Sequence, residues 1–149
     1  FGTLRQNLML GHPHATEAEL IQALRISGAI TMVQQDAASL DRLINEGGRG
    51  LSGGQRQMVL LSRLIVRNPQ IVLLDEPTAS MDEQLEAWVI RQLQQWLTGR
   101  TLILVTHRPA LLNLVDRIVV MENGKIIADG PRDSLLKQAQ NNSNVASIA

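Results

Sequence analysis

The stretch LSGGQRQ, residues 51–57, is followed by an apolar-periodic segment from Met58 to Val66. Ser52 is a natural N-cap, so the pattern predicts that a helix begins here. Gly53 and Gly54 carry no Cβ, and a ligand can therefore approach the backbone closely. The N–H groups and the positive dipole end at such a helix start favour an anion, most commonly a phosphate.

A second stretch, IVLLDEP at residues 71–77, places two adjacent carboxylates after four branched apolar residues. A short apolar run of this kind is typical of a buried strand in a parallel sheet. Ligands of open α/β sheets bind beyond the carboxyl ends of such strands. One acid there, Asp75, can hold Mg²⁺, and the next, Glu76, can polarise a water molecule. A phosphate cradle together with a metal-binding acid points to nucleoside triphosphate chemistry.

Further motifs follow in order: TASMD at residues 78–82 and LVTH at residues 104–107. With LSGGQRQ and IVLLDEP, they resemble the signature motif, the Walker B motif with its glutamate, the D-loop and the H-loop of ABC transporter ATPase domains. The resemblance covers the chain from Phe1 to about Lys137. It implies an α/β fold of the P-loop NTPase class and ABC type, with a parallel sheet core and a helical subdomain.

The phosphate-binding motif G-x-x-x-x-G-K-[ST] does not occur in these residues, whose lysines are Lys125 and Lys137. In the family this Walker A motif precedes the signature motif, as does the Q-loop. We therefore expect the chain to be the C-terminal part of a longer ATPase domain whose N-terminal part is missing. The same reasoning predicts that the fragment alone is inactive.

The resemblance and the turn signals divide the chain into segments. We expect residues 1–50 to form the helical subdomain, 51–67 the signature motif and its helix, and 68–138 the catalytic core from Walker B to the H-loop. Residues 139–149 are small and polar and predict a disordered tail. Asn123-Gly124 between apolar runs predicts a β-hairpin.

Local patterns predict the other elements. Helices are expected at residues 3–10, 16–27, 83–98 and 131–138, and strands at 101–105, 117–121 and 125–128. Residues 36–50 are polar, end in Gly-Gly-Arg-Gly and predict a loop.

The resemblance implies a role for the residues at the strand ends, with ATP and Mg²⁺ as cofactors. Asp75 would hold Mg²⁺, through a water because Mg²⁺ gives up its hydration shell reluctantly. Glu76 would orient or deprotonate the attacking water as the catalytic base. His107 would contact the γ-phosphate.

The resemblance also implies a second ATPase domain as partner, in a homodimer or a heterodimer. In ABC dimers, Ser52, Gly53, Gly54 and Gln55 of one subunit close over the ATP held by the other. Asp82 of the D-loop would join the contacts across the dimer. Such closure assembles the site only when both halves meet.

The signature region is similar to that of exporters, and within them to the type I secretion branch. Glu46 lies in a glycine-rich loop five residues before the signature Leu51, where exporters contact the membrane domain, and Arg56 and Gln57 also favour an exporter. We therefore expect an ATPase that drives export, of a protein or peptide in the type I secretion case. Its partners would be transmembrane domains, fused to it, at the cytoplasmic face of the plasma (inner) membrane.

Composition limits the alternatives. The 14 basic and 14 acidic residues balance, which argues against nucleic acid as a partner, and the absence of Cys excludes a thiolate metal site. A DNA-repair or translation ATPase of the ABC class remains an alternative, although residues 1–50 contain no coiled-coil pattern. A second alternative is a degenerate ABC domain that acts only as a binding partner. The presence of Glu76 and His107 argues against this alternative.

Overall fold

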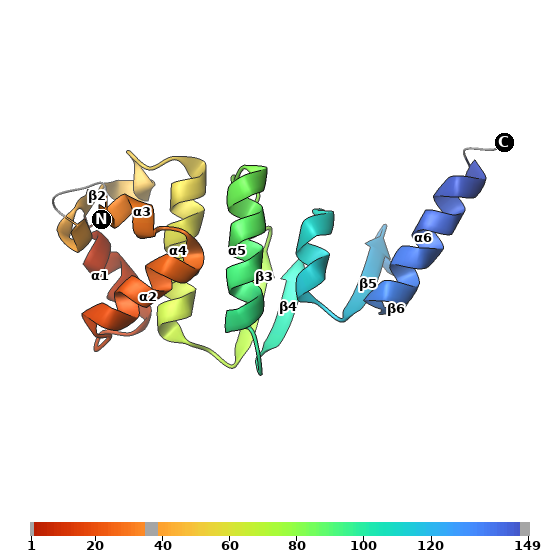
Figure 1. Ribbon diagram of the computed structural model, residues 1–149, viewed down its shortest axis with the longest axis horizontal. Coiled ribbons are helices and arrows are strands. Elements are labelled where there is room, and N and C mark those ends of the chain that lie inside the picture. Colours follow the sequence, from red (N-terminus) through yellow and green to blue (C-terminus); the bar gives the residue numbers. More distant parts are fainter. Residues whose placement is uncertain (1, 35–38, 147–149) are drawn as a thin grey trace. The chain divides into compact units, whose positions relative to one another are not determined.

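The computed structural model describes residues 2–34 and 39–146, and the chain divides into two compact units, residues 1–107 and 108–149. Figure 1 shows the elements in chain order. The first unit combines helices with a parallel pair of strands, and the second contains an antiparallel hairpin and a long helix. In the part of the chain that the structure describes, no helix is long and apolar enough to cross a membrane.

The helices of the first unit begin at residues that cap them. They are α1 (Leu4–Leu8), continued by the 3₁₀ turn Met9–Gly11, α2 (Glu17–Ser27), α3 (Ile30–Gln34), α4 (Gly53–Arg67) and α5 (Glu83–Trp96). Thr3, Thr16, Ser52 and Asp82 precede α1, α2, α4 and α5, and each side chain accepts the N–H of the third residue that follows. These bonds satisfy donors that have no partner inside the helix. The helix starts predicted at Thr16 and Ser52 are confirmed.

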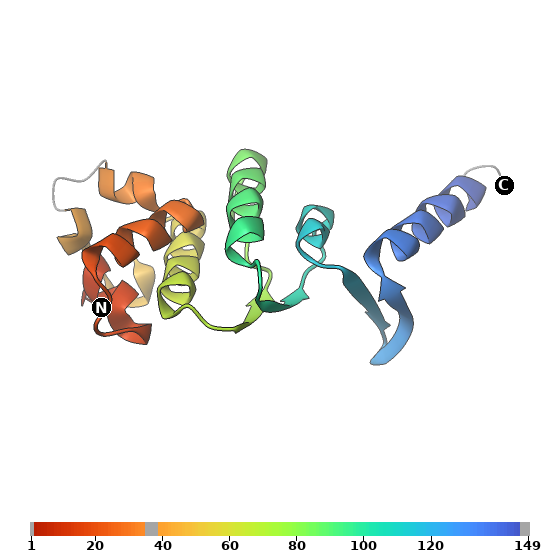
Figure 2. The same ribbon diagram turned by 60° about the horizontal axis from the view of Figure 1, so that its bottom comes forward.

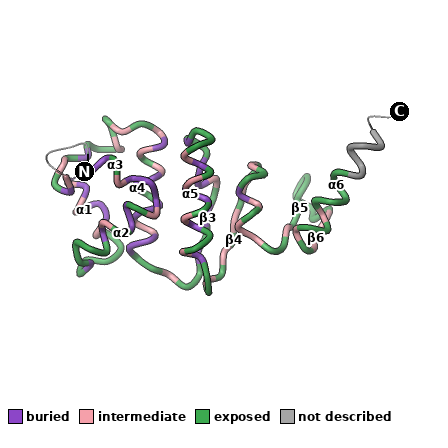
Figure 3. The backbone as a smooth tube through the Cα atoms, viewed as in Figure 1, coloured by how far each residue is buried: buried purple, intermediate pink, exposed green. Residues whose placement is uncertain are grey.

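The core of the first unit lies between α2 and α4, which pack against each other (Figure 1). Leu20 and Leu24 of α2 are fully buried. Ser27 and Ser62 are also fully buried, and their hydroxyls share a hydrogen bond of 2.7 Å that joins the two helices. Figure 3 shows that buried residues gather in α1, α2, α4 and α5. This core supports the start of α4.

The strands β3 (Ile71–Asp75) and β4 (Thr101–Val105) pair in parallel, with Asp75 opposite Val105, and α5 connects them. The predicted parallel sheet is confirmed. Val72 and Leu74 are buried, whereas Leu73 is 67% and Val105 is 60% exposed. The expectation that residues 71–75 form a buried strand holds for one face only: in the described residues, alternate side chains of β3 are buried and exposed.

The second unit contains the 3₁₀ turn Pro109–Leu114, the strands β5 (Arg117–Glu122) and β6 (Lys125–Pro131) and the helix α6 (Arg132–Ala146). Figure 2 shows the hairpin and the helix that follows it. Glu122 pairs with Lys125, so the turn consists of Asn123 and Gly124, with φ of 48° and 74°. Two residues with positive φ form the hairpin turn that Asn-Gly predicts, and this prediction is confirmed.

Two predictions about irregular segments need correction. The helix α6 extends to Ala146, so the disordered tail expected from residue 139 is helical as far as residue 146. No Gly or Pro interrupts residues 139–146, so nothing ends the helix that Leu135, Leu136 and Gln138 favour. The loop expected over residues 36–50 contains a short strand, β2 (Leu43–Ile44), which pairs with β1 (Gly2–Thr3). Residues 36–38 and 147–149 lie outside the described residues.

Candidate functional site

The carboxyl ends of β3 and β4 bring the predicted acids and the predicted histidine together. Asp75 is the last residue of β3, and the Glu76 N–H donates to the Val105 carbonyl at 3.0 Å, which continues the ladder by one residue. Thr106 and His107 follow β4 directly. Parallel pairing therefore places residues 75–76 beside residues 106–107.

The Glu76 carboxylate is held by three donors. Its Oε1 accepts the backbone N–H of His107 at 2.8 Å and lies 2.7 Å from His107 Nδ1, and its Oε2 accepts the Thr106 hydroxyl at 3.1 Å. A ring that carries both protons can donate from Nδ1 to Glu76 and from Nε2 to an anion. The His107 side chain is 81% exposed and that of Glu76 28%, so both can reach a ligand.

These contacts set the charge state of Glu76. Partial desolvation raises the pKa of its carboxyl group, but the hydrogen bonds from the His107 N–H, the His107 ring and the Thr106 hydroxyl outweigh that effect and lower the pKa below its usual value. Glu76 is therefore a carboxylate at neutral pH. A group in this state can accept a proton from water.

The backbone at Glu76 has a φ of +44°, in the left-handed region that residues other than glycine seldom adopt. Such a conformation persists only where the surroundings enforce it, and it is concentrated at functional sites. Here the neighbouring hydrogen bonds of the backbone and the side chain enforce it.

The signature residues form the start of α4. The Ser52 hydroxyl accepts the Gln55 N–H at 3.1 Å, and the Gln55 side-chain oxygen accepts the Ser52 N–H at 2.9 Å, so the two residues form a capping box. Ser52 is exposed. The N–H groups of Gly53 and Gly54 lie in the first turn, where a helix provides no partner for them. Gly54 is buried, so an anion could bind at Ser52 and Gly53.

The two glycines have a second reason to lack a side chain. A Cβ on Gly54 would lie 2.9 Å from the Ser80 carbonyl oxygen, and a Cβ on Gly53 would lie 3.0 Å from the Ser80 Cβ. The start of α4 is thus packed directly on the segment that follows Glu76. The sequence explains these glycines by ligand approach alone and does not indicate this contact.

Gln57 is a site residue whose position the sequence does not predict. Its Nε2 donates to the Glu76 carbonyl at 2.9 Å, and its Oε1 accepts the Ser80 N–H at 2.8 Å. Its position inside the signature stretch is the feature of the sequence that points to a role for Gln57 at the site. Asp82, expected at a dimer contact, caps α5 through its bond with the Leu85 N–H at 2.9 Å. This bond explains Asp82 within its own chain, and the expected contact of Asp82 with a second copy stays a proposal.

The site suits Mg²⁺ only in combination with a phosphate. Asp75 is exposed at the end of β3. Across residues 2–34 and 39–146, no group of three or more His, Cys, Asp or Glu could hold a metal ion. Mg²⁺ commonly keeps several waters and takes one or two carboxylates together with substrate phosphates. Asp75 offers a single exposed carboxylate, which fits that pattern.

The fold and the site define the class of the protein: the chain belongs to the ABC transporter family, whose model matches residues 1–79. The chain is 35% identical over 145 residues to the leukotoxin translocation ATP-binding protein LktB of Pasteurella haemolytica-like sp. (strain 5943B), covering 97% of this chain and 20% of that protein. It is 36% identical over 135 residues to the exotoxin translocation ATP-binding protein PaxB of Pasteurella aerogenes, covering 91% of this chain and 19% of that protein.

Among solved structures, the chain is similar to a bacterial Atm1-family ABC exporter with ATP bound. The TM-score is 0.84 at 28% identity, and the match covers 93% of this chain and 24% of the exporter chain. The predicted ABC-type α/β fold is therefore confirmed, as is the resemblance to the type I secretion branch. The chain spans about a fifth of the length of the relatives that it matches.

Proposed function

We propose that the whole protein is the ATP-hydrolysing component of an ABC exporter and couples ATP binding and hydrolysis to the export of a protein or peptide. Two of its relatives are named for the translocation of a leukotoxin and of an exotoxin, which favours a polypeptide as the cargo. The similar solved structure is that of an exporter.

The observation that carries the proposal is the Glu76 carboxylate held by Thr106 and His107. Its oxygens are oriented by three donors, and it is ionised at neutral pH. In this mechanism Glu76 accepts a proton from the attacking water, and His107 contacts the γ-phosphate from the end of β4. Asp75 would hold Mg²⁺, through a water, and bound Mg²⁺ would neutralise charge on the phosphate oxygens.

The start of α4 would serve the ATP of a second copy. Ser52 is exposed and Gly53 is half-buried, so the Ser52 hydroxyl and the first-turn N–H of Gly53 suit a phosphate, whereas Gly54 is buried where the helix start packs on Ser80. Gln55 keeps Ser52 in place through the capping box. Asp82 follows Ser80, which packs against Gly53 and Gly54, by two residues. We propose that two ATPase domains meet at this surface, each providing half of the other's site.

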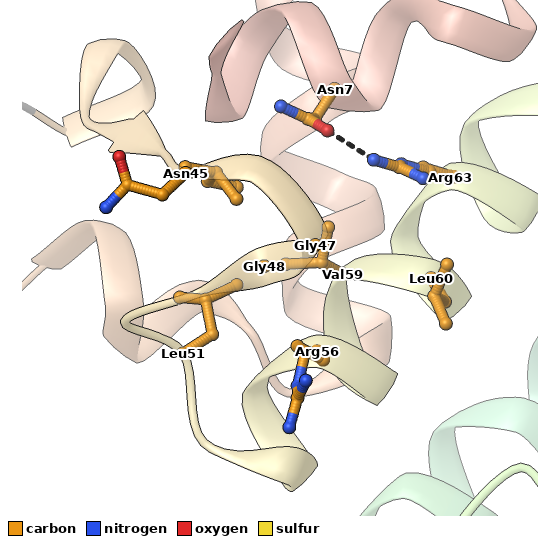
Figure 4. A pocket seen from close by; sticks show the side chains of 10 residues that line it. Asn7, Asn45, Gly47, Gly48, Leu51, Arg56, Val59, Leu60 and Arg63 are labelled. Carbon is orange, nitrogen blue, oxygen red and sulfur yellow. Dashed lines mark hydrogen bonds between the residues drawn. The ribbon is translucent and has the colours of Figure 1, made fainter. Parts of the chain in front are cut away.

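A pocket near the Glu46 loop supports a membrane-domain partner. It has a volume of about 330 Å³ and lies between that loop and α4. Figure 4 shows its lining, with the Asn7 amide oxygen pointing at Arg63. Asn7 accepts a hydrogen bond from the Arg63 guanidinium, whereas the buried Nε of Arg63 has no hydrogen-bond partner among the described residues. Leu60, which lines this pocket, is 57% exposed and offers an apolar contact, so we propose that the transmembrane domains contact the protein here, at the cytoplasmic face of the membrane.

The test is ATP turnover by the whole protein in membranes. Glu76→Gln keeps the size of the side chain and removes the base, so turnover should fall by about 10²- to 10⁴-fold while ATP still binds. Glu122→Gln, the same change on an exposed residue at the end of β5, is the matched control. Turnover by Glu76→Gln at the level of this control would refute the proposed function.

A further inference from the structure

The signature helix and the catalytic glutamate are joined within one chain by a single side chain. Gln57 lies in the second turn of α4, on the helix that begins at Ser52. Its amide group bonds to the backbone at both Glu76 and Ser80, as donor at 2.9 Å and as acceptor at 2.8 Å. Both polar atoms of the amide are therefore committed to the segment that carries the base.

The segment from Glu76 to Ser80 depends on such restraints. Glu76 has a φ of +44°, and its backbone is held by its N–H bond to β4 and by the bonds that its carbonyl accepts from Gln57 and from the Ala79 N–H at 3.2 Å. A strained residue relaxes when one restraint is lost. Relaxation of the backbone at residue 76 would move its carboxylate away from Thr106 and His107.

From this geometry we infer that Gln57 is a positioning residue: it keeps the Glu76 carboxylate in place for the attacking water and ties that placement to the start of α4. The inference rests on the proposed function, because it needs Glu76 to be the base. Gln57 itself touches no reacting atom. Its effect passes through the carbonyl of Glu76 and the N–H of Ser80.

The packing at the helix start strengthens this link. The Ser80 carbonyl lies where a Cβ on Gly54 would be only 2.9 Å away, so the first turn of α4 and the segment at Ser80 are in direct contact. A shift of the helix start is therefore transmitted to Ser80 by contact and to Glu76 through Gln57. When the signature residues close on ATP, the base is held by the same helix.

The experiment compares kinetic parameters of the whole protein. Gln57→Met keeps an unbranched side chain of similar length and removes both hydrogen bonds, so kcat should fall by about 10- to 100-fold, the effect of a misplacement near 1 Å, while the KM for ATP changes by less than about threefold. Gln57→Glu keeps an acceptor for the Ser80 N–H and loses the donor to Glu76, and it should show the same fall. Gln94→Met, the same change on an exposed face of α5, is the control.

One further readout separates positioning from simple loss of stability. In a Glu76→Gln background, Gln57→Met should cause no further fall, since a residue that acts through Glu76 has nothing left to position. Should Gln57→Met fail to fold, Gln57→Glu, which retains the Ser80 bond, carries the same tests.

A kcat for both Gln57 variants at the level of the Gln94→Met control would overturn the inference. So would a fall in the Glu76→Gln background as large as in the wild type. The proposed function fails separately, if Glu76→Gln itself turns over ATP at the wild-type rate. A large loss in Glu76→Gln with none in the Gln57 variants would leave the proposed function standing and refute the inference alone.

Discussion

Replacing Gly54 with alanine tests whether the signature helix is packed on the D-loop segment of its own chain. The new Cβ would lie 2.9 Å from the Ser80 carbonyl oxygen, closer than side-chain carbons approach an oxygen in folded proteins. Because the contacted atom belongs to the backbone, a rotamer change cannot relieve the clash. Overpacking of this kind typically costs about 1–3 kcal/mol.

The assay is hydrogen exchange of the whole protein without nucleotide, so that any effect on ATP binding is excluded. The Ser80 N–H, which donates to Gln57, reports on the affected segment. Since each 1.4 kcal/mol is tenfold, a cost of about 1–3 kcal/mol predicts exchange at Ser80 that is faster by about 5- to 150-fold. The amides of α2 should change little, because they lie outside the contact.

Gly53→Ala provides the matched comparison. Its Cβ would lie 3.0 Å from the Ser80 Cβ and 3.1 Å from the Ser80 Oγ, and both of these are side-chain atoms. Adding Ser80→Gly to Gly53→Ala should therefore restore slow exchange of the amide at residue 80. Adding it to Gly54→Ala should not. Unaltered exchange in Gly54→Ala, or its rescue by Ser80→Gly, would refute the reasoning.

Three other predictions follow from the same contacts. Thr106→Val removes a donor to Glu76, so the pKa of the Glu76 carboxyl should rise towards its usual value. Activity requires the charged form and is lost as the pH falls through this pKa. A pH–rate profile of the variant should therefore show activity lost at a higher pH than in the wild type. Leu24→Ala should cost about 2–5 kcal/mol, measured as faster exchange in α2 and α4, whereas Leu60→Ala, 57% exposed, should change stability by less than about 0.5 kcal/mol. A Cβ added at Gly124 would have no atom within 4 Å, so Gly124→Ala should cost only the backbone strain of a positive φ, about 1–2 kcal/mol. This cost should be measured as faster hydrogen exchange confined to β5 and β6.

Features governed by neighbours in sequence could be predicted. The cap at Ser52 is one such feature. A serine that directly precedes a helical segment can accept a hydrogen bond from an N–H of the first turn, and this depends only on its near neighbours in sequence. The Asn123-Gly124 turn forms because both residues accept a positive φ. The parallel pairing of β3 and β4 also follows from pattern, since two short apolar runs separated by a helical segment form a βαβ unit.

Features that depend on contacts between distant segments could not be predicted. The bonds from Gln57 reach residues 19 and 23 positions further along the chain, and no periodicity signals them. The left-handed backbone at Glu76 is imposed by β4 and α4, whereas its residue type gives no indication of it. The full length of α6 is not predictable from sequence, because small polar residues such as those after Gln138 are typical of tails and also occur in helices.

The left-handed conformation of Glu76 has a consequence for how the protein can change over evolutionary time. Glycine at position 76 would relax the backbone at no steric cost, and a variant that has lost its base would therefore fold more readily than the working one. Selection for ATP turnover therefore favours glutamate at this position, whereas selection for stability alone favours glycine. A lineage freed from the need to hydrolyse ATP should drift first here, and copies of the domain that have lost their base should be recognisable by a higher melting temperature.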